Sequence, residues 1–405
     1  MNVASFRAIV CCLGLICCGA PASAQKSYGP GVSDTEIKIG QTNTYSGPAS
    51  SYGMIGKVEA AYINKINAAG GVNGRKITFI SLDDAYSPAK AVEQVRKLVD
   101  QDNVLALMGI MGTPSNLAVA KYLNNNKVPQ LLSASGSPKL MDPHTYPWTT
   151  VFYLPQEVEG RLLGQWLLTE KPQARIGVLY QNDDFGKGYL TGLKAASGEA
   201  ASKMIVKEES YQLSNPTVDS QLLVLKAANI DTIYIAAAPK FAAQTLRKIS
   251  ELGWSVERII TGASSSARAV LQPAGLDASK GVLATLYIKN PDDPMWADDQ
   301  ATKDYLAFMK EWAPNEPSTE SLAVMGYSVA QTMVEILRRC GDNLTRENLL
   351  SVATNIKGYQ LPMFIPGLVI NVSPTDRVAM KQARLGRFNG VSWEFVSDVV
   401  SRQEQ

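Results

Sequence analysis

Short strand-like runs alternate with helix-like runs along most of the chain. Residues 36–42 alternate apolar and polar side chains, as a half-buried strand does, whereas residues 56–69 carry apolar side chains at helical spacing. Ser87-Pro88 predicts a helix start, because serine caps helix N-termini and proline fits the first turn. The same alternation predicts strands at 76–82, 104–108 and 129–133 and helices at 87–101 and 114–125.

A second series of the same kind begins at Ala174, after a Pro- and aromatic-containing break at residues 146–159. Its predicted strands are 175–180, 204–211, 231–237, 258–261 and 281–288, and its predicted helices are 187–199, 220–228 and 240–252. Further helices are predicted at 298–311, 321–339 and 345–355, a strand at 368–371, and a hairpin at 383–388 and 392–396. Repeated βα units form parallel sheets with helices on both faces, so two series predict two α/β lobes, each with a doubly wound parallel sheet.

The first 24 residues have the pattern of a cleaved signal peptide. Arg7 supplies the positive start, residues 8–20 are apolar but too short to span a membrane, and Ala22-Ser23-Ala24 is a small-residue cleavage site. The alternatives are a membrane anchor and a lipoprotein, but Cys17 and Cys18 lack the small residue that normally precedes a lipidated cysteine. We therefore expect an exported, soluble periplasmic protein.

Composition narrows the class of protein further. Four of the five cysteines lie in the predicted signal peptide, so the mature chain keeps only Cys340 and has no internal disulfide. The 405 residues are 45% hydrophobic and 19% charged, which suits two ordinary globular domains. The net charge is only +2 and the basic residues are scattered, so we expect no nucleic acid partner and no membrane-surface partner.

The chain offers few features of an enzyme. His144 is the only histidine and lies in a loop, without a nucleophile elbow or a metal-ligand spacing beside it. Asp83-Asp84 ends a strand, where turn and capping hydrogen bonds are the simpler interpretation. Gly186, Gly188 and Gly192 follow a strand, but their G-x-G-x-x-x-G spacing is one residue too long for a dinucleotide fingerprint. We expect no catalytic residue, no metal and no cofactor.

Two loops predict a binding site for a carboxylate. Residues 112–115 follow one predicted strand and open a helix, and residues 133–138 follow the next strand. Both loops belong at the carboxyl edge of one parallel sheet, where open α/β folds bind ligands. Their hydroxyl and N–H groups suit an anion, although each loop taken alone is equally well explained as a helix cap.

The sequence resembles the branched-chain amino acid binding proteins of ABC importers, which have the type I periplasmic binding fold. The segments that carry the resemblance run in family order over nearly the whole mature chain. They are IKIGQTNTYSGPASSYG (37–53), INAAGGVNGRKI (66–77), DDAYSPAKAVEQVRKLV (83–99), NDDFGKGYLTGLKAA (182–196) and TIYIAAAP (232–239).

The resemblance implies two lobes joined by three crossings, with a hinge that closes the cleft between them. It assigns residues 25–152 and 287–365 to lobe 1, and residues 153–286 and 366–405 to lobe 2. It also implies an inner-membrane ABC permease and its ATPase as partners of a monomeric, non-enzymatic binding protein.

The family's ligand contacts transfer residue by residue to seven positions. These are Tyr52, Thr113, Ser135, Ser137, Phe185, Ala238 and Ser264. Thr113 matches a carboxylate-binding serine, and Ser264 matches the glutamate that pairs with the substrate's α-ammonium. Further candidates are Gly112, Trp148, Phe152, Gln156 and Met325.

Departures from the family pattern concern the ammonium half of that site. Ser264 carries no charge, and Phe185 and Ala238 replace pocket tyrosines. The family's small disulfide is also missing, with Tyr86 and Gly112 at its two positions. A buried α-ammonium without a carboxylate partner is costly, so these departures favour a ligand that has a carboxylate and no α-amino group.

We therefore expect an aromatic acid of the benzoate or cinnamate kind, for which the smaller residues leave room. An amino acid stays open as the alternative if Asp183, Asp184 or Glu157 supplies the missing carboxylate. Two other classes of protein also stay open, a ligand-sensing ectodomain of the same fold and a secreted dinucleotide-linked enzyme.

Overall fold

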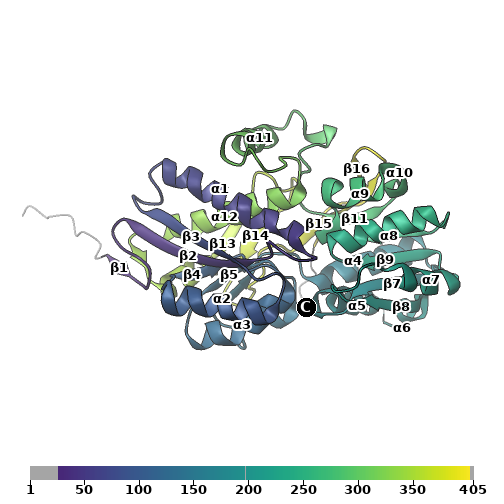
Figure 1. Ribbon diagram of the computed structural model, residues 1–405, viewed down its shortest axis with the longest axis horizontal. Coiled ribbons are helices and arrows are strands. Elements are labelled where there is room, and N and C mark those ends of the chain that lie inside the picture. The colour runs from purple at the N-terminus through teal and green to yellow at the C-terminus, as the bar shows by residue number, and fades with distance from the viewer. Residues whose placement is uncertain (1–25, 197, 402–405) are drawn as a thin grey trace, which may run out of the picture.

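Two lobes lie side by side along the long axis of the molecule, each built on its own sheet (Figure 1). The computed structural model describes residues 26–196 and 198–401, so the predicted signal peptide lies outside the described residues. The first sheet has the strand order β3-β2-β4-β5-β6, and the main path of the second is β16-β15-β11-β10-β9-β7-β8. Within these two sheets the strand pairs are parallel except those that β15 makes, and helices cover both faces. The predicted fold class, two doubly wound parallel α/β lobes, is confirmed.

The first lobe combines the first βα series with helices from the last third of the chain. Ser87 caps its second helix as predicted, with Oγ accepting a hydrogen bond from Lys90 N. Its strands are β2 (Glu36–Asn43), β3 (Lys76–Asp83), β4 (Ala106–Met108), β5 (Gln130–Ser133) and β6 (Thr149–Val151). Its helices are α1 (Gly53–Ala68), α2 (Pro88–Arg96), α3 (Thr113–Asn125), α11 (Gln300–Trp312), α12 (Ser321–Cys340) and α13 (Arg346–Ala353).

The second lobe contains the second βα series and the C-terminal hairpin. Its strands are β7 (Ile176–Gln181), β8 (Ile205–Tyr211), β9 (Thr232–Ala236), β10 (Glu257–Ile260), β11 (Leu283–Leu286), β15 (Gln382–Phe388), β16 (Trp393–Phe395) and β17 (Val400–Ser401). Its helices are α4 (Gln156–Glu170), α5 (Asp184–Ala195), α6 (Glu199–Met204), α7 (Asp219–Ala227), α8 (Pro239–Glu251), α9 (Gln272–Ala274) and α10 (Leu276–Ser279).

Two parts of the chain differ from the sequence prediction. The expected break at 146–159 contains β6 and the first turn of α4, whose helical pattern the proline at position 155 hides. Near the C-terminus, β14 (Ile370–Val372) pairs with β13 (Ile356–Tyr359), and Val378 bridges to Val151 of β6. The expected third crossing at residue 365 stays a prediction.

Glycines allow α4 and α5 to pack closely. A Cβ atom on Gly192 would overlap the carbonyl oxygen of Glu157, and one on Gly160 would overlap that of Tyr189. A Cβ atom on Gly188 would lie 2.8 Å from Gln156 Oε1. Packing between helices thus accounts for the glycine spacing that suggested a dinucleotide site.

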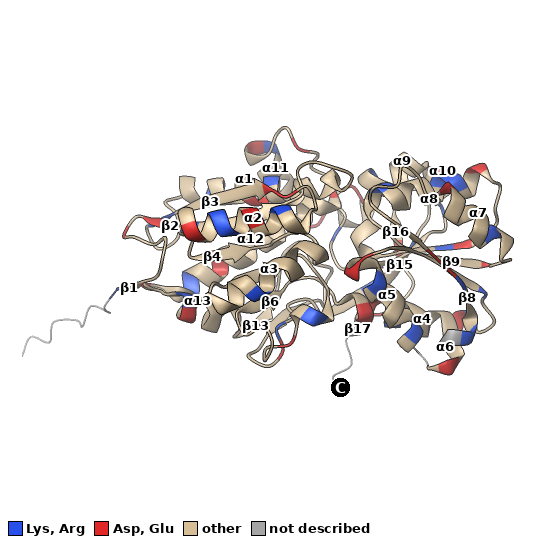
Figure 2. Ribbon diagram, turned by 60° about the horizontal axis from the view of Figure 1, so that its bottom comes forward, with Lys and Arg blue, Asp and Glu red and all other residues tan. Residues whose placement is uncertain are grey.

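Charged residues of both signs are interspersed over both lobes in the view of Figure 2. Within residues 26–196 and 198–401, no helix has the length and apolar character that a membrane span needs. The same part of the chain holds no cluster of three His, Cys, Asp or Glu side chains placed to bind a metal ion.

Candidate ligand cavity between the lobes

A cavity lined by residues of both lobes lies next to the carboxyl ends of the first sheet's strands. The first lobe contributes Thr113, Ser135 and Met325, whereas the second contributes Gln156 and Phe185. Seven of the predicted positions thus line the cavity: Tyr52, Gly112, Thr113, Ser135, Gln156, Phe185 and Met325.

The two lobes touch one another around this cavity. Gln156 Nε2 of α4 donates a hydrogen bond to Thr113 Oγ1 of α3 at 3.0 Å. Lys139 Nζ pairs with Asp184 at 2.5 Å on the surface. Contacts of this kind across a cleft define the closed arrangement of a hinged two-lobe protein.

One end of the cavity is lined by hydroxyl and N–H groups. Thr113 is the first residue of α3, and its Oγ1 lies 2.9 Å from Ser135 Oγ, to which Ser137 N donates at 3.1 Å. Gly112 precedes the helix with φ +92, a conformation that favours glycine. No Lys, Arg or His of the described chain lines the cavity, so a carboxylate bound here would depend on hydroxyl groups and a helix N-terminus.

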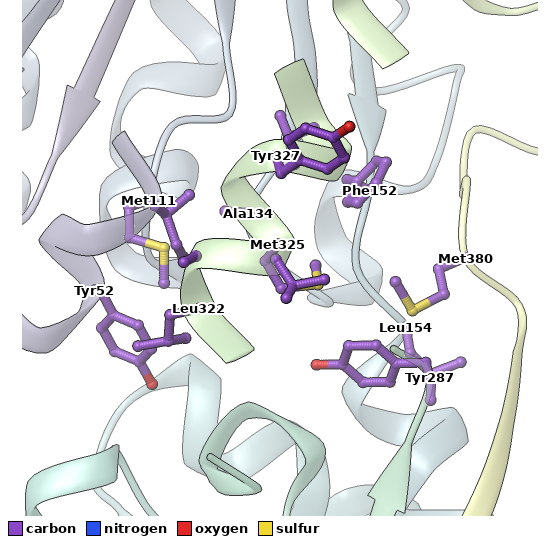
Figure 3. Packing of buried hydrophobic residues seen from close by; sticks show 14 of the residues in the cluster. Tyr52, Met111, Ala134, Phe152, Leu154, Tyr287, Leu322, Met325, Tyr327 and Met380 are labelled. Carbon is purple, nitrogen blue, oxygen red and sulfur yellow. The ribbon is translucent and has the colours of Figure 1, made fainter. Parts of the chain in front are cut away.

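Aromatic side chains form much of the remaining wall. They are Tyr52, Tyr86, Tyr153, Phe185, Tyr189 and Tyr287. In Figure 3, Tyr52 lies beside Leu322 on one side of the view and Tyr287 lies beside Leu154 on the other. Burial raises the pKa of the tyrosine hydroxyls, so they stay neutral and can donate hydrogen bonds. Such a wall combines apolar ring faces with polar tips.

The Tyr86 ring packs directly onto Gly112. A Cβ atom on Gly112 would lie 2.7 Å from Tyr86 Cε2. The two positions at which the family resemblance implied a disulfide are therefore in contact, and here an aromatic ring of the cavity wall fills the space.

Glu159 is the cavity residue that the sequence analysis missed. It lies one helical turn after Gln156 on α4, is only 2% exposed, and its Oε1 accepts a hydrogen bond from Gly262 N at 2.6 Å. Desolvation raises its pKa to about 7. Glu159 is therefore an acidic side chain in the cavity wall, at a position that was not among the acidic residues considered from the sequence. Had residues 156–159 been recognised as a first helical turn, Glu159 would have been a candidate. It lies three residues after the predicted Gln156, and positions i and i+3 share a helix face.

Five predicted residues lie outside the cavity wall. Ser264 Oγ donates to Ala237 O at 2.5 Å and so turns away, leaving the neighbouring Ser265 in the wall. Ala238 caps α8, and its N–H donates to Tyr211 Oη. Ser137 contributes its N–H to Ser135, as described above. Phe152 and Trp148 lie elsewhere, Phe152 in the buried core against Phe364 and Trp148 beside Asn124.

The acidic residues proposed as substitutes for the missing glutamate also lie outside the wall. Asp183 caps α5 by accepting from Phe185 N and Gly186 N, which is why this helix begins before the predicted position. Asp184 pairs with Lys139 on the surface, and Glu157 does not line the cavity. His144 is exposed in its loop. Asp83 accepts the predicted turn hydrogen bond from Ala85 N, and it also accepts a hydrogen bond from Tyr45 N of the neighbouring loop.

Two hinged α/β lobes that close around a cavity define the type I periplasmic binding fold. The chain belongs to the periplasmic binding protein family, whose model matches residues 36–391, and within it to the branched-chain amino acid ABC transporter type. Proteins of this family bind solutes and work with ABC permease components, and the family implies a periplasmic location.

Known proteins resemble this chain over most of its length. An amino acid binding protein of Pseudomonas aeruginosa is 23% identical over 316 residues, which are 76% of this chain and 80% of the relative. A branched chain amino acid ABC transporter structure from Thermus thermophilus with bound valine has a TM-score of 0.82 at 18% identity, covering 92% of this chain and 98% of that one. A solute binding protein from Rhodopseudomonas palustris BisB5 in complex with 3,4-dihydroxybenzoic acid has a TM-score of 0.75 at 21% identity, covering 90% and 97%.

Proposed function

We propose that this protein binds an aromatic carboxylic acid without an α-amino group and delivers it to an ABC permease. The observation that carries the proposal is the cavity wall, in which six aromatic side chains surround a space that ends at Thr113 and Ser135. Ring faces and phenol hydroxyls suit an aromatic ring, and the hydroxyl groups with the N-terminus of α3 suit its carboxylate. The carboxylate contacts at Thr113 and Ser135 and the aromatic contacts at Tyr52 and Phe185 are part of this proposal.

The mechanism is binding followed by closure. The ligand enters the open form on the first lobe, and the second lobe then brings Gln156 and Phe185 against it. Closure excludes water from the carboxylate and forms the surface that the permease recognises. We further propose that the protein is exported by its N-terminal signal peptide and acts as a monomer.

An amino acid is the second candidate, and Glu159 is the observation that favours it. A buried carboxylate in the wall is a suitable partner for a ligand ammonium group. Against it, Glu159 is held at Gly262 of the second lobe, whereas the carboxylate contacts lie on the first lobe. An α-ammonium lies only one carbon from its carboxylate, so it belongs beside Thr113.

A thermal-shift panel tests the two candidates directly. A ligand at about 100 times its dissociation constant stabilises the protein by roughly 2.7 kcal/mol, enough to raise the melting temperature by several degrees. The panel contains benzoate, cinnamate, leucine, phenylalanine, keto acids and short fatty acids. We expect a shift with the aromatic acids, whereas a shift with leucine and none with the aromatic acids would exclude the proposal.

A further inference from the structure

Gln156 and Glu159 point toward opposite walls of the same cavity. They lie three residues apart on α4, so their side chains leave the same face of the helix. Gln156 reaches the first lobe at Thr113, whereas Glu159 reaches the second lobe at Gly262. A molecule that fills the cavity from wall to wall therefore meets hydroxyl and N–H groups at one end and a carboxyl group at the other.

The Glu159 carboxyl group has acceptor capacity left for a ligand. Its protein partners are Gly262 N, which donates at 2.6 Å, and the Thr285 hydroxyl group, whereas a carboxyl group offers about four lone-pair sites. Its titratable neighbours Tyr189, Tyr234 and Tyr287 are buried phenols, and no cationic side chain lines the described cavity. A ligand hydroxyl group can donate to the remaining lone pairs of Glu159 without adding a charge to the cavity.

We infer that Glu159 accepts a hydrogen bond from a hydroxyl group on the ring, at the position farthest from the ligand's carboxylate. This inference rests on the aromatic acid proposed above and narrows it to a hydroxylated aromatic acid. Glu159 then determines specificity, because an unsubstituted ring leaves the buried carboxyl group without a partner at its ligand-facing side. The phenol of 4-hydroxybenzoate is the simplest probe that has both groups.

Calorimetric titration of the full mature chain with benzoate and with 4-hydroxybenzoate tests the inference. We expect 4-hydroxybenzoate to bind about 10-fold more tightly, because benzoate leaves a buried acceptor without a partner. Glu159→Met removes the acceptor at similar length, and we expect the ratio of the two affinities to fall to about one. Glu159→Gln keeps an oxygen for Gly262 N and turns an amide donor toward the ligand, so the ratio falls several-fold there too.

The control variant is Glu170→Met, at the exposed end of the same helix, which we expect to keep the wild-type ratio. Equal affinities of the wild type for both acids would overturn the inference while leaving the aromatic-acid proposal intact. If the Glu159 variants lose affinity for both acids to the same extent, the inference would also be overturned. Glu159 would then support the cavity and not contact the hydroxyl group. Binding of leucine or phenylalanine, with neither acid bound, would instead overturn the proposed function itself.

Discussion

The Gln156 amide of the second lobe donates a hydrogen bond to the Thr113 hydroxyl of the first lobe, over 3.0 Å. The same hydroxyl lies 2.9 Å from Ser135 Oγ. Thr113 is therefore both a contact that closes the lobes and the centre of the polar end of the cavity. In the proposed function, Thr113 serves both closure of the lobes and recognition of the ligand's carboxylate, so one side chain couples the two events.

Replacing Thr113 by valine tests this shared role. Valine keeps the shape of threonine but removes the hydroxyl group, so a carboxylate ligand should bind more weakly by about 1 to 3 kcal/mol. Calorimetry on the wild type and the variant measures the difference. Thr113→Ser retains the hydroxyl and should stay close to the wild type. Unchanged affinity in Thr113→Val would show that the ligand's carboxylate lies elsewhere.

The contact between α4 and α5 predicts a second effect, on stability. Gly192→Ala places a Cβ atom onto the Glu157 carbonyl oxygen, so one helix must move away from the other. Overpacking of this kind should lower the free energy of unfolding by about 1–3 kcal/mol, measured by denaturant titration. Lys187→Ala, an exposed position on the same helix, should change it by less than about 0.5 kcal/mol. Equal stability of Gly192→Ala and the wild type would show that the helices are not in close contact.

The periodic parts of the fold were predictable because their signals are local. Strand β2 and helix α3 begin within one residue of the predicted positions, and Ser87 caps its helix as expected. Helix α4 was missed because Pro155 and nearby aromatic residues resemble a linker, and Glu159 was missed with it.

From the residue pattern alone, the cavity was predictable only where its residues follow sheet strands; positions such as Met325 of α12 came from the family resemblance. Thr113 and Ser135 come directly after neighbouring strands, so the rule for the carboxyl edge of a parallel sheet locates them. Ser264 was assigned by alignment, and its neighbour Ser265 lines the wall instead, because one hydrogen bond to Ala237 O decides which side chain turns inward. Periodicity does not contain that information.

Two contacts between the lobes should contribute unequally to closure. Ser266 Oγ donates to Glu320 Oε1 at 2.5 Å in a buried position, whereas Lys139 and Asp184 are both well exposed. Ser266→Ala should weaken ligand binding by about 1 kcal/mol at any ionic strength. Lys139→Ala should weaken it by less, and that loss should vanish in high salt, because water and ions screen an exposed pair. Calorimetry at two salt concentrations distinguishes the effects of the two variants. A salt-dependent effect of Ser266→Ala would contradict the conclusion that the Ser266–Glu320 contact is buried.

Glu159 should make stability fall as the pH rises from about 4.5 to about 7. Its carboxyl group is buried, and desolvation raises its pKa from 4.5 to about 7 in the folded protein. Below pH 4.5 both the folded and the unfolded state hold the proton, so this group contributes no pH dependence there. Between the two values the unfolded state loses the proton first, so the free energy of unfolding decreases, by roughly 3 kcal/mol once both states are ionised.

Other buried acids also contribute to the pH profile, Glu59 among them, so the comparison with Glu159→Gln is what isolates this group. The variant has no proton to lose at this position, and its stability relative to the wild type should therefore rise by about 3 kcal/mol between pH 4.5 and pH 8. Glu170→Gln, at the exposed end of the same helix, controls for the loss of a glutamate and should follow the wild type. Urea titrations across this range measure all three proteins. Parallel pH profiles for the wild type and Glu159→Gln would mean that water reaches the Glu159 carboxyl group and that this group is ionised at ordinary pH. A hydrated carboxylate is not left without a partner when the ligand has no hydroxyl group. The preference for a hydroxylated ligand would then lose its physical basis.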